Sequence, residues 1–186
     1  MLRAQLYLLL ARYLDGPPTQ ASLATAAALV GDDAPLGRAI NSLVTTARAS
    51  DLDRLSEQYH ELFVGLGRGQ LVPFGSYYLT GFLNEKPLAR LRQVMAERGI
   101  AREDGVAEPE DHIASLAEMM AGFITGGFGA PMSLAEQKLF YAEHIGSWAP
   151  HFFRDLAGNA ISPFYAALGA VGQAFLNIEE RAFRMI

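Results

Sequence analysis

Apolar residues recur every three or four positions along most of the chain, which is the spacing of one face of an α-helix. The clearest stretches cover residues 2–13, 111–125, 134–148 and 164–178. Long runs that alternate apolar and polar residues, as half-buried strands do, are absent, and Ala and Leu dominate over Val, Ile and Thr. The pattern predicts an all-α fold, a single-domain bundle of about eight to ten helices over residues 1–186.

Helix start signals agree with this periodicity. Ser133 and Glu136 have the spacing of a capping box, in which each side chain accepts a hydrogen bond from the other residue's backbone N–H. Ser162 followed by Pro163 marks the start of the last helix, and Ser50 or Asp51 can cap the helix that carries the apolar positions of 52–63. These signals predict where three of the helices begin.

Two stretches rich in Gly and Pro interrupt the helical pattern, at 65–75 and 126–131. The first is too long for a simple turn. We interpret both as candidate hinges that would permit exchange of helices between copies. The expected state is a monomer, with a domain-swapped dimer as the alternative.

Composition narrows the classes of function. The chain of 186 residues is 51% hydrophobic, has a net charge of −5 and contains no Cys. A negative field disfavours nucleic acid as the main partner, and the lack of Cys removes disulfides, zinc ribbons and thiol catalysis. The apolar start is interrupted by Gln5 and Arg12, and the apolar run at 156–178 is split by Pro163, so we expect no membrane insertion. The expected location is the cytoplasm.

Motifs for catalysis, metals and nucleotides are weak or missing. His60-Glu61 lacks the second His of a zinc-protease helix, and Pro150 lies between His144 and His151. The glycines at 65, 67 and 69 follow a helix, whereas a phosphate-binding loop follows a strand. We therefore expect no cofactor and no metal.

Two segments carry distinctive chemistry. Residues 103–111 hold five carboxylates just before a strongly amphipathic helix, either as a solvated helix start or as an anionic patch that receives Arg or Lys from a partner. Residues 73–78, Pro-Phe-Gly-Ser-Tyr-Tyr, hold three aromatic side chains that either anchor a loop or line an apolar groove. Together they would suit a ligand that is apolar along its length and cationic at one end.

The order of four motifs resembles the TorD/DmsD/NarJ family of redox-enzyme maturation chaperones. The motifs are Tyr-x-x-Leu-Phe-x-Gly at 59–65, the aromatic stretch at 73–78, Glu-Pro-x-Asp-His at 108–112, and Phe-x-x-x-His-x-x-x-Trp-x-Pro-x-Phe at 140–152. Phe74 stands where many members carry Trp. The resemblance covers about half of the chain.

The resemblance implies a TorD-like cytoplasmic chaperone that is not an enzyme. Its partner would be the twin-arginine signal peptide of a molybdenum-containing (molybdopterin) oxidoreductase in its apo form, held back from export until the cofactor is inserted. The implied peptide-binding residues are Phe74, Ser76, Tyr77, Tyr78, Glu108, Pro109, Asp111 and His112.

Two alternatives stay open from the residues themselves. One is a small helical enzyme that uses Asp111 and His112 as an acid–base pair. The other is a helical nucleic-acid-binding regulator that uses Arg90, Arg92 and Arg98.

Overall fold

The computed structural model describes residues 2–65, 69–102 and 108–186, and within these ranges it contains ten α-helices and two short π-helices. The elements are α1 (Leu2–Leu14), α2 (Gln20–Ala27), α3 (Pro35–Arg48), α4 (Leu52–Tyr59), η1 (His60–Val64), α5 (Gly75–Thr80), α6 (Lys86–Glu97), α7 (Ile113–Thr125), α8 (Leu134–Phe140), η2 (Tyr141–Ile145), α9 (Ala149–Ala157) and α10 (Pro163–Arg184). An isolated bridge is the extent of β-pairing in these ranges. The predicted all-α class is confirmed.

The predicted helix starts are also confirmed. The Ser133 hydroxyl accepts from the Glu136 N–H at 3.3 Å, and the Glu136 carboxylate accepts from the Ser133 N–H at 2.8 Å. The Asp51 carboxylate caps α4 from outside its first turn. Ser162 caps α10. This last helix extends beyond the predicted residue 178, because its buried face continues through Phe183.

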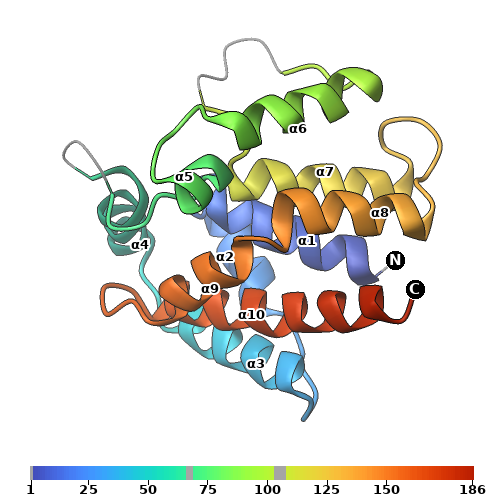
Figure 1. Ribbon diagram of the computed structural model, residues 1–186. Helices are drawn as coiled ribbons and strands as arrows, with labels where there is room; N and C mark the ends of the chain where they lie inside the picture. The colour runs from blue at the N-terminus through green and yellow to red at the C-terminus, as the bar shows by residue number, and fades with distance from the viewer. Residues whose placement is uncertain (1, 66–68, 103–107) are drawn as a thin grey trace. The chain divides into compact units, whose positions relative to one another are not determined.

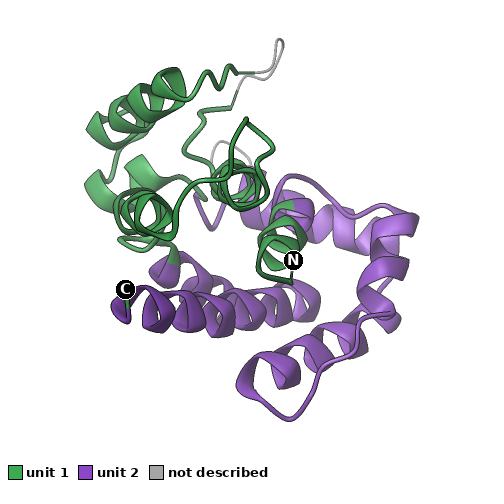
Figure 2. Cartoon of the chain, turned by 90° about the vertical axis from the view of Figure 1, so that its right-hand side faces the viewer, with its two compact units in different colours: residues 1–11, 73–149, 186 green, residues 12–72, 150–185 purple. Residues whose placement is uncertain are grey.

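The described chain divides into two compact units (Figure 2). Unit 1 comprises residues 1–11, 73–149 and 186, and unit 2 comprises residues 12–72 and 150–185. One passage between the units, at 72/73, falls inside the first Gly/Pro-rich stretch, whereas the stretch at 126–131 lies within unit 1. The two hinges and the single-domain description stay predictions.

In unit 2, α10 packs along α3, and α2 packs on α3 as well (Figure 1). A Cβ atom at Gly172 would lie 2.2 Å from the Phe153 ring, so glycine is what allows α9 and α10 to approach so closely. The ring of Tyr165 on α10 forms a cluster with the rings of Tyr59 and Phe63, with centroid distances of 5.0–6.0 Å. These contacts make an aromatic core under the first family-like motif.

In unit 1, α7 is buried over most of its surface and packs on α8, while α5 packs on α6. The Phe123 and Phe140 rings meet edge to face, with centroids 4.8 Å apart. None of the described helices combines the length and the apolarity needed to cross a membrane. The aromatic and acidic segments meet at the N-terminal end of α7.

Candidate functional site

The aromatic segment and the acidic segment are joined by backbone hydrogen bonds in unit 1. The Gly75 N–H donates to the Asp111 carbonyl at 3.0 Å, and the Ile113 N–H donates to the Pro73 carbonyl at 2.9 Å. Between these bonds Phe74 and His112 form an antiparallel bridge, with ring centroids 5.0 Å apart. The structure thus brings together two segments that the sequence only suggested as partners.

Asp111 links the two segments a second time through its side chain. It is only 3% exposed, and its Oδ2 atom accepts hydrogen bonds from the Ser76 N–H at 2.6 Å and from the Ser76 hydroxyl. Both donors belong to the first turn of α5, so the carboxylate caps this helix in place of a residue adjacent in sequence. Its other oxygen, Oδ1, is buried and has no hydrogen-bond partner.

The His112 side chain is buried and caps the N-terminus of α7. Its ring is 4% exposed, and Nδ1 accepts a hydrogen bond from the Ala114 N–H at 3.2 Å, which caps α7. Burial lowers the pKa of His112 to about 4, so the imidazole is neutral at pH 7. The bonds of Asp111 and His112 go to Ser76 and Ala114, and this arrangement does not support the acid–base pair of the enzyme alternative.

A tryptophan that sequence reasoning passed over supports the aromatic segment. Trp148 is buried, its ring lies 5.4 Å from that of Tyr78, and its indole N–H donates to the His144 carbonyl at 2.7 Å. A Cβ at Gly75 would lie 3.0 Å from the indole nitrogen, so the backbone of α5 rests directly on this ring. The Tyr77 and Tyr78 rings are half-buried and lie 6.3 Å apart.

The carboxylates of the acidic segment have different surroundings. Glu108 is exposed and Pro109 half-buried, whereas Glu103 and Asp104 lie outside the described residues. Glu110 forms a bidentate ion pair with Arg92: the Arg92 Nη2 atom lies 2.8 Å from Oε2 of the carboxylate, and Nε lies 3.2 Å from Oε1. Burial alone would raise the pKa of Glu110, but the hydrogen bonds from Arg92 hold it below its usual value.

Two arginines of α6 and Arg98, which directly follows this helix, face acidic side chains. Arg90 lies 3.7 Å from Glu143, Arg92 pairs with Glu110, and Arg98 lies 2.6 Å from Glu136. The hydrogen bond from Arg98, followed by that from Ser133, lowers the pKa of Glu136 to about 2. A helix whose cations are neutralised in this way offers little free charge to a phosphate backbone, which disfavours the nucleic-acid alternative.

A small cavity lies beneath the aromatic segment. It has about 10 Å³ of free space and is lined by Gly75, Leu79, Pro87, Leu91, Asp111, Leu116, Glu143, His144 and Trp148. His144 is 7% exposed, and its Nε2 atom, like Asp111 Oδ1, is buried without a hydrogen-bond partner. Glu143, His144 and Trp148 are site residues that the sequence analysis did not select, although His144 and Trp148 stand in the motif at 140–152.

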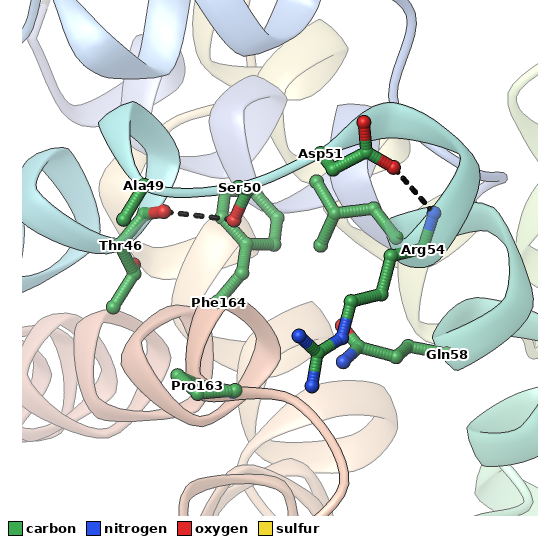
Figure 3. Close-up of a pocket in the computed structure, with 9 residues that line it drawn as sticks. Thr46, Ala49, Ser50, Asp51, Arg54, Gln58, Pro163 and Phe164 are labelled. Carbon is green, nitrogen blue, oxygen red and sulfur yellow. Dashed lines mark hydrogen bonds between the residues drawn. The ribbon is translucent and has the colours of Figure 1, made fainter.

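Unit 2 has a cavity of its own, with about 190 Å³ of free space (Figure 3). The Arg54 side chain extends from α4 toward Pro163 beside the Gln58 amide, which itself donates to the Ile161 carbonyl. The Ser50 hydroxyl donates to the Thr46 carbonyl. None of the predicted peptide-binding residues lines this cavity. Within the described residues, no group of three or more His, Cys, Asp or Glu could hold a metal ion.

Comparison with known proteins places this architecture. The sequence pattern of the family described as nitrate reductase delta subunit matches residues 30–154. The chaperone protein TorD of Vibrio cholerae is 27% identical over 159 residues, which cover 79% of this chain and 72% of that protein. A probable Tat proofreading chaperone DmsD of Haemophilus influenzae is 34% identical over 116 residues, which cover 61% of this chain and 54% of that protein.

Among solved structures, a putative redox enzyme maturation protein from Archaeoglobus fulgidus superposes with a TM-score of 0.61 at 19% identity, over 95% of this chain and 94% of that one. That likeness shows a shared fold. The helical architecture and the named relatives together define a redox-enzyme maturation chaperone and not an enzyme. The chain belongs to the nitrate reductase delta subunit family, which includes the NarJ, TorD and DmsD chaperones.

Proposed function

We propose that this chaperone binds the twin-arginine signal peptide of a molybdenum-containing oxidoreductase in the cytoplasm, as a monomer. The apoenzyme would be held back from export until its cofactor is inserted. The relative from Haemophilus influenzae, a probable Tat proofreading chaperone, supports this class of client. The observation that carries the proposal is the paired aromatic and acidic segments, because a signal peptide is cationic at its arginines and apolar beyond them.

The apolar stretch of the signal has a candidate surface next to the paired segments. Tyr77 and Tyr78 are half-buried, and the chain continues from them into Leu79, Phe82 and Leu83, all of which are exposed. Phe82 is 69% exposed, an unusual position for such a large apolar ring. Burial of this strip under an apolar peptide would stabilise the complex by about 25 cal/mol per Å², before the cost of ordering the peptide.

The charged end of the signal would meet the acidic segment. Glu108 is exposed and can receive a guanidinium directly, while Glu110 can exchange Arg92 for an arginine of the peptide. A guanidinium can replace another guanidinium on a carboxylate with both hydrogen bonds kept, whereas a lysine keeps only one. Exchange at Glu110 would therefore favour arginine over lysine in the client.

The other predicted site residues would act by shaping this surface. Phe74, Ser76 and His112 hold the two segments together through the contacts described above, and Pro109 precedes Glu110 at the turn into the bridge. Occupation of the signal works by mass action, since the export machinery must compete with the free energy of binding.

The test is isothermal titration calorimetry with a synthetic leader peptide that carries two arginines followed by an apolar stretch. Phe82→Ala is expected to weaken binding by about tenfold, because it removes the largest exposed apolar contact. Leu139→Ala is the matched control, because Leu139 on α8 is 71% exposed and lies outside the paired segments. Failure of the peptide to bind, or equal losses for the two variants, would overturn the proposal.

A further inference from the structure

The small cavity of unit 1 contains two polar atoms that the fold leaves unsatisfied. Asp111 Oδ1 and His144 Nε2 are both buried and without a hydrogen-bond partner, and both residues line this cavity. A buried polar atom that makes no hydrogen bond destabilises the folded protein, because it has lost its hydrogen bonds to water. Two such atoms at one cavity indicate that something other than the chain itself satisfies them in the working state.

The charged side chains around the cavity indicate the charge of the group that would satisfy these two atoms. The Glu143 carboxylate lies 3.9 Å from His144 Nε2, and Asp111 supplies a second carboxylate. Two cations lie nearby: Arg90, whose guanidinium lies 3.7 Å from Glu143, and Arg92, which interacts with Asp111 but is held on Glu110. Both side chains of this Arg90–Glu143 pair are exposed to solvent, so the pair contributes little and is easily broken. The cavity therefore favours a cationic hydrogen-bond donor.

The side chains that line the cavity indicate the shape of the cationic group that it would accept. Leu79, Pro87, Leu91 and Leu116 are apolar, and the Trp148 ring forms another wall. A flat cation that presents several N–H groups can lie against an indole face while it donates to acceptors at its edge. Burial lowers the pKa of His144, so its imidazole is neutral at pH 7 and does not repel such a cation.

We propose that this cavity, completed by Glu143, His144 and Trp148, is the receptor for one arginine side chain of the bound peptide. The inference rests on the proposed function. It adds Glu143 and His144 of η2, and Trp148 three residues beyond this helix, to the site. The guanidinium donates to Asp111 Oδ1 and to His144 Nε2, and Glu143 lies at its outer side after release from Arg90.

The cavity must widen for this occupant. Its free space is about 10 Å³, close to that of a single water, and an adjoining cavity of about 30 Å³ is lined by Leu79, Pro87, Arg90, Glu143 and His144. Four residues line both cavities, so outward movement of the first turn of α6 would merge them. This movement would break the exposed Arg90–Glu143 pair and loosen the packing around the buried Leu88.

The test uses three peptides that share one apolar stretch and carry Arg-Arg, Lys-Lys or Gln-Gln ahead of it. Trp148 is the sole tryptophan of the chain, so its fluorescence reports directly on the cavity. We expect the Arg-Arg peptide to change the emission and the Gln-Gln peptide to leave it unchanged. Asp111→Asn is expected to reduce the preference for Arg-Arg over Gln-Gln about tenfold, because the isosteric amide can still accept from Ser76 but carries no charge.

Three further variants guard against a folding defect. Glu143→Gln changes an exposed side chain and is expected to lower the same preference about threefold. Glu97→Gln, on α6 but outside both cavities, should leave it unchanged. His144→Gln keeps an acceptor but cannot be protonated, so it should lessen the loss of Arg-Arg affinity that we expect of the wild type as the pH falls, while the carboxylates of Asp111 and Glu143 keep their share of it.

The outcomes separate the two proposals. If no peptide binds, the proposed function fails and the receptor fails with it. If the Arg-Arg peptide binds with its full preference to Asp111→Asn, Glu143→Gln and His144→Gln alike, the function stands and the cavity is not the arginine receptor. If Lys-Lys binds as tightly as Arg-Arg and changes the Trp148 emission equally, the cavity takes any cation and the guanidinium assignment is wrong.

Discussion

The two π-helices of the described chain have the same backbone pattern but different surroundings. Each continues an α-helix and ends at a glycine whose N–H bonds five residues back, Gly65 to the His60 carbonyl at 2.7 Å and Gly146 to the Tyr141 carbonyl at 2.6 Å. Each also contains a histidine. In η1 His60 is exposed and its Nδ1 lies 2.7 Å from the Ser56 carbonyl, whereas in η2 His144 is buried with Nε2 unsatisfied.

The difference shows that a π-helix is not a site by itself. In η1 the wider turn directs aromatic rings into the core of unit 2, where Tyr59 and Phe63 pack on Tyr165. In η2 it places an imidazole and a carboxylate at a cavity. The motif at 59–65 carries part of the family resemblance, yet it builds the interior of unit 2, whereas the segment at 141–148 lines the candidate site.

The largest expected effect comes from removing an aromatic ring in or just beyond each π-helix, Phe63 in η1 and Trp148 after η2. Trp148→Ala should lower the free energy of unfolding by about 4 kcal/mol, because Trp148 is fully buried and supports both Gly75 and Tyr78. Phe63→Ala should cost about 2 kcal/mol, since Phe63 is only half-buried. Urea denaturation measures both values, and equal losses would contradict the view that η2 lies in the more tightly packed surroundings.

A smaller effect is expected from pH. His112 has a pKa of about 4 when folded against about 6.5 when unfolded, so the unfolded state binds protons more tightly. The contribution is complete above pH 6.5 and is lost as the pH falls toward 4, by about 3 kcal/mol in total. Unfolding midpoints between pH 7 and 4 test this window.

The control for the pH experiment is His112→Asn, which keeps an acceptor for the Ala114 N–H and does not titrate. The variant should therefore lose stability less steeply with acid than the wild type. Identical pH profiles for the two proteins would show that His112 is accessible to protons in the folded state.

The smallest effect concerns an unsatisfied atom near η1. The Tyr165 hydroxyl is buried without a hydrogen-bond partner, and burial raises the pKa of this side chain. Tyr165→Phe should therefore stabilise the protein by about 1 kcal/mol and leave peptide binding unchanged, because Tyr165 belongs to unit 2 and to neither of the paired segments. Denaturant titration and calorimetry measure the two quantities, and a destabilised variant would reveal a partner for the hydroxyl.

Much of the fold could be predicted from the sequence, because the signals that start a helix come from residues close together in the chain. The Ser133–Glu136 capping box and the Ser162 cap each depend on residues within three positions, so their outcome could be predicted without tertiary information. α5 was not predicted, because its cap comes from Asp111, thirty-five positions away from Ser76. A cap supplied from such a distance leaves no signal in a window of sequence.

The candidate site was predictable in part for the same reason. The pairing of Phe74 and His112 supports the choice of the two segments, although whether they bind peptide stays a prediction. Burial leaves no local signal in the sequence: the family resemblance predicts that Asp111 and His112 contact the peptide, whereas the structure encloses both by packing. The unsatisfied atoms on Asp111 and His144 are invisible in sequence, because satisfaction depends on every neighbour in three dimensions.

The bridge between Phe74 and His112 also bears on how this fold tolerates change. It closes a long loop that contains α5 and α6, and the entropy of closing a loop rises only slowly with its length. Residues can therefore be added to or removed from the solvent side of that loop at small thermodynamic expense while the tie holds. Related proteins can in this way differ in the loop that contains α5 and α6, and so in the client that they bind, while the bridge between Phe74 and His112 stays the same.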